Sequence, residues 1–276
     1  MHVGLLTARF GAEKRIEDIV AWAAGAGFKA LEVTCGPTGH LRPEQVLADD
    51  GAGVRRLFEK AGLRISSLAC YRRYDFATPQ TEAYLKDLRR VMDAAKCLGV
   101  ETVCALVGFP AAGKDKLASI NEFLPPAFGP VAEEAGRAGL RIAFENWYAT
   151  CLQNLEHFAA VARLLPDNVG FNFDPSHLCW QRIDYLAAVT EFAPRLFHTH
   201  AKDVAIDEAA LRRRGVLDGG WWRYVIPGLG VVDWGQYVGR LRLGGYDGVL
   251  SVEHEDRAYG PEAGFALALK NLARFC

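Results

Sequence analysis

Four acidic or imidazole side chains follow one another in the second half of the chain, each at the end of a short apolar run. The runs end in AFENW, FNFDPSH, FHTHAKD and LSVEHED, and they present Glu145, Asp174, His200 and Glu253. Three carboxylates gathered around one imidazole repel one another or take up protons unless a cation lies among them. The residue types therefore predict a metal site with three oxygen donors and one nitrogen donor.

The donor set indicates which ion would fit. Carboxylate-rich ligation favours Mn²⁺ or Mg²⁺, and the imidazole keeps Co²⁺, Zn²⁺ and Fe²⁺ as alternatives. We expect one bound divalent ion, with Mn²⁺ as the first choice.

The four candidate ligands can share one site only if the runs that carry them are neighbouring strands. Side chains two residues apart on a strand share a face. If the ligands point inward, the alternate positions lie on the outer surface under the helices, and they hold Phe144, Phe173, Phe197 and Val252. The first two intervals between ligands are each about one strand–helix unit long. The third interval is one such unit plus a long loop.

The chain alternates β-rich apolar runs with longer amphipathic stretches. We expect strands over Val3–Thr7, Ala30–Cys35, Arg64–Cys70, Thr102–Gly108, Arg141–Trp147, Val169–Asp174, Leu196–His200 and Val249–Glu253. We expect helices near residues 15–26, 43–62, 80–98, 115–138, 154–165, 183–193, 233–244 and 261–275. Eight strands separated by helices predict parallel pairing and a closed barrel. The active site of such a barrel lies at the carboxyl ends of the strands, where the candidate ligands stand.

Turn residues support this repeat. Glycines in AGAGF, KAGL, CLGV, RAGL and LGGY stand where helices of a strand–helix repeat end. No linker rich in Pro, Gly and Ser divides the chain, so we predict one domain over residues 1–276, an α/β protein with a single (β/α)8 TIM barrel. The one long irregular connection, residues 201–232, has a length typical of functional loops. Its two tryptophans indicate an ordered segment.

Composition narrows the classes of function. The 276 residues are 50% hydrophobic and carry a formal net charge of -1, which is typical of a soluble globular protein and unfavourable for binding nucleic acid through its phosphates. No apolar run is long enough to span a membrane, and the first residues lack the features of a signal peptide. Seven scattered cysteines without a CxxC pair indicate free thiols in the cytoplasm. We expect a small-molecule partner, with no nucleic acid and no membrane.

At these residues the sequence resembles the xylose isomerase-like superfamily of sugar isomerases and epimerases, which includes D-tagatose 3-epimerase-like enzymes. The resemblance covers nearly the whole chain and is most specific at FEN, DPSH, HxHxKD, PGLGVVDW and VEHED. The family's four metal ligands match Glu145, Asp174, His200 and Glu253. The resemblance also implies that Glu145 and Glu253 act as the acid/base pair and that His177 contacts the substrate.

The chain departs from the family pattern after the seventh predicted strand. Where the epimerases carry a short segment with a substrate-binding arginine, this sequence has a longer one, in which Arg223 is our candidate. Lys202 is a candidate for binding a substrate hydroxyl or phosphate, or else it pairs with Asp203. Trp147 is a candidate for an apolar wall under a sugar. The departure leaves the particular sugar, its phosphorylation and the particular reaction open.

Other polar residues near these runs have ordinary structural interpretations. We expect His198 to be a packed histidine, Glu255 to lie outside the ligand set, and Arg212–Arg214 to be a solvated face. Glu32 lies inside a predicted apolar strand, where it either binds substrate or pairs with an arginine from a neighbouring strand.

The function that the resemblance implies is a divalent-metal-dependent isomerase or epimerase of a ketose sugar or sugar phosphate. The metal would polarise the carbonyl, one glutamate would remove the α-proton, and the resulting enediolate would be reprotonated to give an epimer or an aldose. Alternatives on the same scaffold are dehydration of a keto-polyol and isomerisation of a hydroxy-keto acid. A non-catalytic sugar-binding barrel is a further alternative, and the oligomeric state stays open, a homo-oligomer included.

A phosphodiesterase like the apurinic-site endonucleases is a less favoured hypothesis. Those enzymes need additional histidines for a three-metal cluster. Here the third and fourth predicted strands end in LACY and LVGF, and the segment after the long loop reads VVDWG, without a DxH pair.

Overall fold

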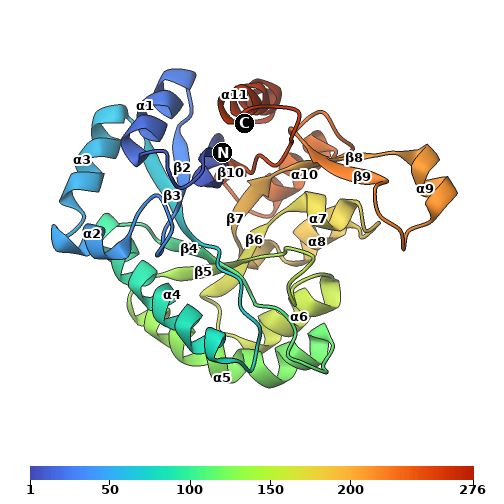
Figure 1. Cartoon of the computed structure of the whole chain (residues 1–276), viewed down its shortest axis with the longest axis horizontal. Helices are drawn as coiled ribbons and strands as arrows, with labels where there is room; N and C mark the ends of the chain where they lie inside the picture. Colours follow the sequence, from blue (N-terminus) through green and yellow to red (C-terminus); the bar gives the residue numbers. More distant parts are fainter.

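The structure, a computed structural model, describes residues 1–276 and contains a closed barrel of eight parallel strands (Figure 1). The barrel strands are β1 (His2–Leu6), β2 (Ala30–Thr34), β3 (Arg64–Cys70), β4 (Thr102–Ala105), β5 (Arg141–Glu145), β6 (Val169–Phe173), β7 (Leu196–Ala201) and β10 (Val249–Val252). They follow one another around the barrel in chain order, and β1 closes the ring against β10. The predicted fold class is confirmed, and each predicted strand is present with its ends shifted by at most a few residues.

Helices surround the barrel (Figure 1). They are α1 (Ile16–Ala26), α2 (Pro43–Ala48), α3 (Ala52–Ala61), α4 (Pro79–Leu98), α5 (Lys116–Arg137), α6 (Leu155–Leu164), α7 (Pro175–Cys179), α8 (Tyr185–Glu191), α10 (Trp234–Leu243) and α11 (Pro261–Leu272). Short 3-10 turns lie at Thr7–Phe10, Ala193–Arg195 and Ala273–Phe275. The helix predicted near residues 43–62 is wrong as one element, because Asp50 and Gly51 adopt positive φ angles between α2 and α3.

Strand alternation separates two apolar layers. Phe144, Phe173 and Val252 belong to the large core between the strands and the helices, as predicted. Phe197 differs: it is partly exposed, lies under the Arg141 guanidinium and packs against a small cluster inside the barrel. That inner cluster consists of Leu6, Ala69, Cys104 and Ala143. Its small side chains leave room inside the barrel for the polar groups described below.

The long connection after β7 is ordered, as predicted, but it contains elements that we did not predict. Strands β8 (Asp203–Ile206) and β9 (Trp222–Val225) form an antiparallel hairpin, and α9 (Glu208–Arg214) lies between them. The hairpin and α9 project from one side of the barrel, in orange at the right of Figure 1. Trp222 stacks on Trp180 with ring centroids 4.4 Å apart, and Trp221 is buried. These aromatic contacts hold the hairpin against the barrel.

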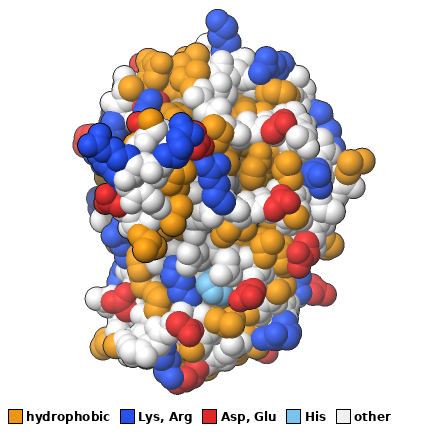
Figure 2. Space-filling model, turned by 90° about the vertical axis from the view of Figure 1, so that its right-hand side faces the viewer, with side chains coloured by type: hydrophobic (Ala, Val, Ile, Leu, Met, Phe, Trp, Pro, Cys, Tyr) orange, Lys and Arg blue, Asp and Glu red, His pale blue; other side chains and the backbone are white.

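The distribution of surface charge and the state of the cysteines match what the balanced charge and the scattered cysteines of the sequence predict. Figure 2 faces the side from which α9 projects and shows basic, acidic and hydrophobic side chains interspersed, with no surface of a single charge sign. All seven cysteines are free thiols. None of the helices combines the length and apolar character that a membrane crossing requires.

Candidate active site

The four candidate ligands converge at the carboxyl end of the barrel. Glu145 is the last residue of β5, His200 lies on β7, and Asp174 and Glu253 directly follow β6 and β10. His200 Nδ1 lies 3.4 Å from Glu145 Oε1 and 3.2 Å from Glu253 Oε2. The ligand-type atoms of Glu145, Asp174, Glu253 and His177 lie within 4.8 Å of one another. The structure therefore brings Glu145, Asp174 and Glu253 together with His177, and it places His200 beside Glu145 and Glu253.

Two buried atoms of this cluster have no hydrogen-bond partner, Asp174 Oδ2 and His200 Nδ1. An unsatisfied buried polar atom costs about 1–3 kcal/mol, and folded proteins leave few of them. Asp174 Oδ2 carries a lone pair that a divalent cation accepts, His200 Nδ1 offers one when its proton is displaced, and both atoms belong to the predicted ligand set. The residues present therefore fit a divalent metal ion.

Lys202 is buried among these carboxylates. Its Nζ lies 2.5 Å from Glu253 Oε2 and 3.2 Å from Glu255 Oε2. It also lies 3.1 Å from Asp174 Oδ2, without the alignment that a hydrogen bond requires. Burial alone would lower the pKa of Lys202, but the charges of Asp174 and Glu253 hold it well above its usual value. The ammonium thus offsets part of the negative charge of the cluster.

His200 is oriented by a buried carboxylate on β2. Its Nε2 lies 3.0 Å from Glu32 Oε2, which also accepts a hydrogen bond from the Ser251 hydroxyl at 2.7 Å. The Tyr71 hydroxyl donates to Glu32 Oε1 at 2.7 Å. Burial alone would raise the pKa of Glu32, but the neighbouring histidine charges and these hydrogen bonds lower it to about 2. Burial alone would lower the pKa of His200, but the charges of Glu32 and Glu253 hold it well above its usual value in the absence of a metal. When Nδ1 gives up its proton to a metal ion, the proton on Nε2 stays with Glu32, as in metal-binding histidines. Glu32 therefore pairs with a histidine rather than with an arginine.

His177 lies in α7, the short helix that Asp174 caps. Its Nδ1 lies 2.7 Å from the Tyr224 hydroxyl, and its Nε2 lies 3.6 Å from Glu145 Oε1 and from Asp174 Oδ2. Burial and the charge of Lys202 lower the pKa of His177 to about 4. A neutral imidazole at this point is able to exchange a hydrogen bond with a substrate oxygen.

A cavity of about 240 Å³, which we call the reaction cavity, opens onto this cluster. Three residues predicted to bind substrate, His177, Lys202 and Trp147, line it. The structure does not bring Arg223 into the cavity: its side chain is 63% exposed and pairs with Asp256 at 3.0 Å. The rest of the lining is Leu6, Ala8, Tyr71, Arg73, Leu106, Glu145, Glu253 and Glu255.

Tyr71 and Arg73, within three residues of the end of β3, were not among the predicted site residues. The guanidinium of Arg73 lies 4.6 Å from the centre of the Trp147 ring, at the edge of the reaction cavity. The signal was their position, because residues immediately after a barrel strand lie at its carboxyl end. Both residues belong to the CYRR segment, which contains no acid or histidine.

Asp203 is an anchor for the long loop rather than a partner of Lys202. Its carboxylate accepts hydrogen bonds from one indole and four backbone N–H groups, those of Trp234, Val204, Gly228, Gly230 and Val232. Gly230 approaches so closely that an added Cβ would lie 2.2 Å from Asp203 Oδ1. The PGLGVVDW segment therefore folds around this carboxylate and fixes the end of the hairpin that carries Tyr224.

The remaining polar residues behave largely as expected. His198 is packed inside the barrel, with Nδ1 3.2 Å from Asn172 Oδ1. It forms a second buried group with Glu32 and Cys104, in which burial raises the pKa of the Cys104 thiol well above its usual value. Arg212–Arg214 form the exposed last turn of α9.

Comparisons with known proteins identify the relatives of this chain. The uncharacterized protein YfiH of Bacillus subtilis is 26% identical over an alignment 292 positions long, which covers 93% of each chain. An inosose dehydratase of Klebsiella pneumoniae is 25% identical over 265 residues, covering 89% of this chain and 84% of the relative. The solved structure of the IOLI protein with a bound zinc atom covers 100% of this chain and 96% of that one, with a TM-score of 0.78 and 18% identity, a likeness of fold. The family model described as xylose isomerase-like TIM barrel matches residues 20–275. The chain belongs to the xylose isomerase-like TIM barrel family.

Proposed function

We propose that this protein is a divalent-metal-dependent enzyme that removes the proton next to the ketone of a sugar or keto-polyol. The observation that carries this proposal is the convergence of Glu145, Asp174, His200 and Glu253, with Asp174 Oδ2 and His200 Nδ1 left without partners. These four residues would hold the ion, with Mn²⁺ as the first choice. When bound, the ion supplies a Lewis acid that makes the α-proton of a ketone more acidic.

Glu145 and Glu253 are the groups that we assign to proton transfer. Both line the reaction cavity, and β5 and β10 are separated by two strands around the barrel. The two carboxylates therefore reach a bound substrate from different directions. One removes the α-proton, and general acid–base help of this kind contributes about 10²–10⁴ in rate.

Lys202 favours dehydration of a keto-polyol as the reaction that follows. Loss of the hydroxyl from the next carbon requires a proton on the departing oxygen. The Lys202 ammonium, between Glu253 and Glu255, is placed to bind that oxygen. The glutamate that took the α-proton then returns it to the leaving group: one C–H and one C–O bond break, a C=C bond forms, and water departs. The likeness to an inosose dehydratase supports this assignment.

Epimerisation or isomerisation of a ketose is the second candidate. The observation that favours it is the pair of carboxylates facing one cavity, since one can remove the proton and the other can return a proton to the opposite face. The two reactions share the first step and differ only in the fate of the deprotonated substrate.

Proton exchange tests the shared step, and the products separate the two outcomes. Manganese-loaded protein is incubated in D₂O with an inosose, D-fructose and D-tagatose, and NMR follows deuterium at the α-carbon. Dehydration also gives a conjugated product with ultraviolet absorbance, whereas epimerisation gives a second sugar. We expect Glu145→Gln and Glu253→Gln each to remove nearly all exchange, and Glu156→Gln, an exposed residue of α6, to leave it unchanged. No exchange across the panel with metal bound would refute the proposal.

A further inference from the structure

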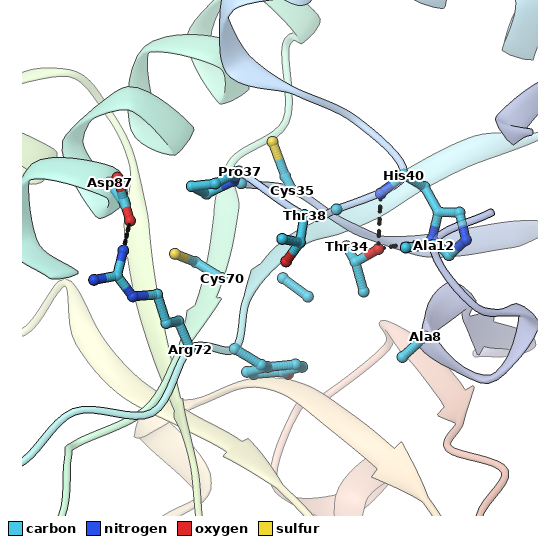
Figure 3. A pocket seen from close by; sticks show the side chains of 14 residues that line it. Ala8, Ala12, Thr34, Cys35, Pro37, Thr38, His40, Cys70, Arg72 and Asp87 are labelled. Carbon is cyan, nitrogen blue, oxygen red and sulfur yellow. Dashed lines mark hydrogen bonds and ion pairs between the residues drawn. The ribbon is translucent and has the colours of Figure 1, made fainter.

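A second cavity, larger than the reaction cavity, lies beside it. It has a volume of about 450 Å³ and is formed by segments that follow β1, β2 and β3 (Figure 3). Ala8 and Tyr71 line both cavities, so the two meet at these residues. Ligand pockets in proteins usually enclose about 300–1,000 Å³. The reaction cavity falls below this range, whereas the two cavities together lie well within it.

Tyr71 forms a fixed wall where the two cavities meet. Its hydroxyl donates to Glu32 Oε1 at 2.7 Å and accepts from Asn172 Nδ2 at 2.6 Å. The side chain is thereby held from inside the barrel, so its ring does not have to be ordered when a ligand binds. A preorganised aromatic wall lowers the entropy cost of binding and offers an apolar surface to a ring-shaped ligand.

The lining of the second cavity combines apolar groups with hydrogen-bonding groups and has no free charge. Arg72 is paired with Asp87, and both residues line the cavity (Figure 3). Cys35 and Cys70 are buried, and burial raises the pKa of the Cys70 thiol to about 12, so that it stays neutral. The exposed Thr38 adds a hydroxyl. A phosphate or carboxylate would meet Asp87 here and no unpaired cation, whereas a neutral ligand with hydroxyl groups meets matching partners.

We propose that the second cavity is a subsite for a neutral glycosyl ring, so that the substrate is a ketose or keto-polyol linked to a second sugar. The inference rests on the proposed function for the part of the substrate that reacts. The ketone lies in the reaction cavity, the linkage passes Ala8 and Tyr71, and the second ring packs against the apolar lining. Its hydroxyls reach Thr38 and the Arg72–Asp87 pair.

Equilibrium binding to one-ring and two-ring ketoses tests this subsite. Isothermal titration calorimetry of manganese-loaded protein compares D-fructose with lactulose, turanose and palatinose, in which a glycosyl unit is attached at three different hydroxyls of fructose. We expect at least one disaccharide to bind about tenfold or more tightly than fructose. Thr38→Trp fills the subsite and should remove this gain while fructose affinity stays unchanged. Ala209→Trp, on the exposed and distant α9, is the matched control and should change neither affinity.

The subsite and the proposed reaction fail in different ways. Equal affinity for fructose and all three disaccharides would overturn the subsite, and so would a Thr38→Trp variant that keeps the gain or loses fructose binding as well. Tighter disaccharide binding that Thr38→Trp abolishes, without deuterium exchange into any ligand, would support the subsite and refute the proposed reaction. Deuterium exchange into fructose without tighter binding of any disaccharide would support the proposed reaction and refute the subsite.

Discussion

Replacing Glu32 with glutamine should weaken metal binding although Glu32 is not one of the proposed ligands. Glu32 Oε2 receives the Nε2 contact of His200 at 3.0 Å and the Ser251 hydroxyl at 2.7 Å. In Glu32→Gln, an NH₂ group at this position would face two donors. His200 can avoid the clash by moving its proton to Nδ1, but Nδ1 is then no longer available to an ion. The alternative amide orientation places the NH₂ group against the Tyr71 hydroxyl instead.

The structure sets the size of this effect. The Glu32 carboxylate is fully buried and contacts three side-chain donors, so water cannot replace the hydrogen bond that the glutamine amide fails to accept. Loss of a group that orients a metal-binding histidine typically costs about 10–100-fold in metal affinity. We expect a loss of this size for Mn²⁺, equivalent to about 1.4–2.8 kcal/mol.

Competition with a fluorescent chelator measures Mn²⁺ affinity, and nitrogen NMR of the His200 ring in the metal-free protein reports which of its two nitrogens carry a proton. The matched control is Ser251→Ala, which removes one hydrogen bond to the same oxygen and leaves the carboxylate charge in place. We expect this control to retain most of the metal affinity. A correctly folded Glu32→Gln protein with native Mn²⁺ affinity and an unchanged His200 proton position would refute the reasoning.

Three further predictions concern stability. Asp203→Asn replaces one of two accepting oxygens with an NH₂ group, so two or three of the five N–H donors lose their partner. At about 1–3 kcal/mol each, urea unfolding should show a loss of about 2–9 kcal/mol, whereas the exposed helix-capping control Asp207→Asn should change little. Burial and the charge of Lys116 lower the pKa of His157, so the folded state favours the neutral imidazole, and the stability gained from it is lost as pH falls below about 6.5. Between about pH 7 and about pH 5, the His157→Gln variant should therefore lose less stability than the native protein. An equal loss in both proteins would contradict the assignment. Removing divalent ions with EDTA should lower the unfolding temperature, and Mn²⁺ at 100 times its Kd should restore about 2.7 kcal/mol of unfolding free energy. An unfolding temperature that neither treatment changes would count against the metal site.

Local patterns along the chain were enough to predict the barrel and the residues at its mouth. A two-residue periodicity of apolar side chains predicts the strands, and a helical periodicity predicts the helices. Glycines such as Gly27, Gly62 and Gly99 end helices in the left-handed backbone conformation that this residue favours. Once eight parallel strands close in chain order, the inward-pointing side chains at their carboxyl ends face the same opening. The meeting of Glu145 with Glu253 followed from that closure.

Contacts between distant segments could not be predicted in this way. Glu32 meets His200 across the interior of the barrel, from strands that are not neighbours. Arg223 was our candidate for the cavity, yet it pairs with Asp256 outside it, whereas Arg73 lines it. The hairpin that carries Arg223 takes its place from aromatic stacking and from the Asp203 anchor, which are contacts between residues far apart in the chain.

The sequence by itself determined the barrel and the identity of the side chains at its mouth, because the periodicity of each strand and the alternation of strands with helices are local properties. Only the tertiary structure decided which nitrogen of His200 faces the other carboxylates, where the Lys202 ammonium lies, and that a second cavity adjoins the first. These features depend on hydrogen bonds and packing between segments that follow different strands. Their geometry is defined only when the eight-stranded barrel has closed.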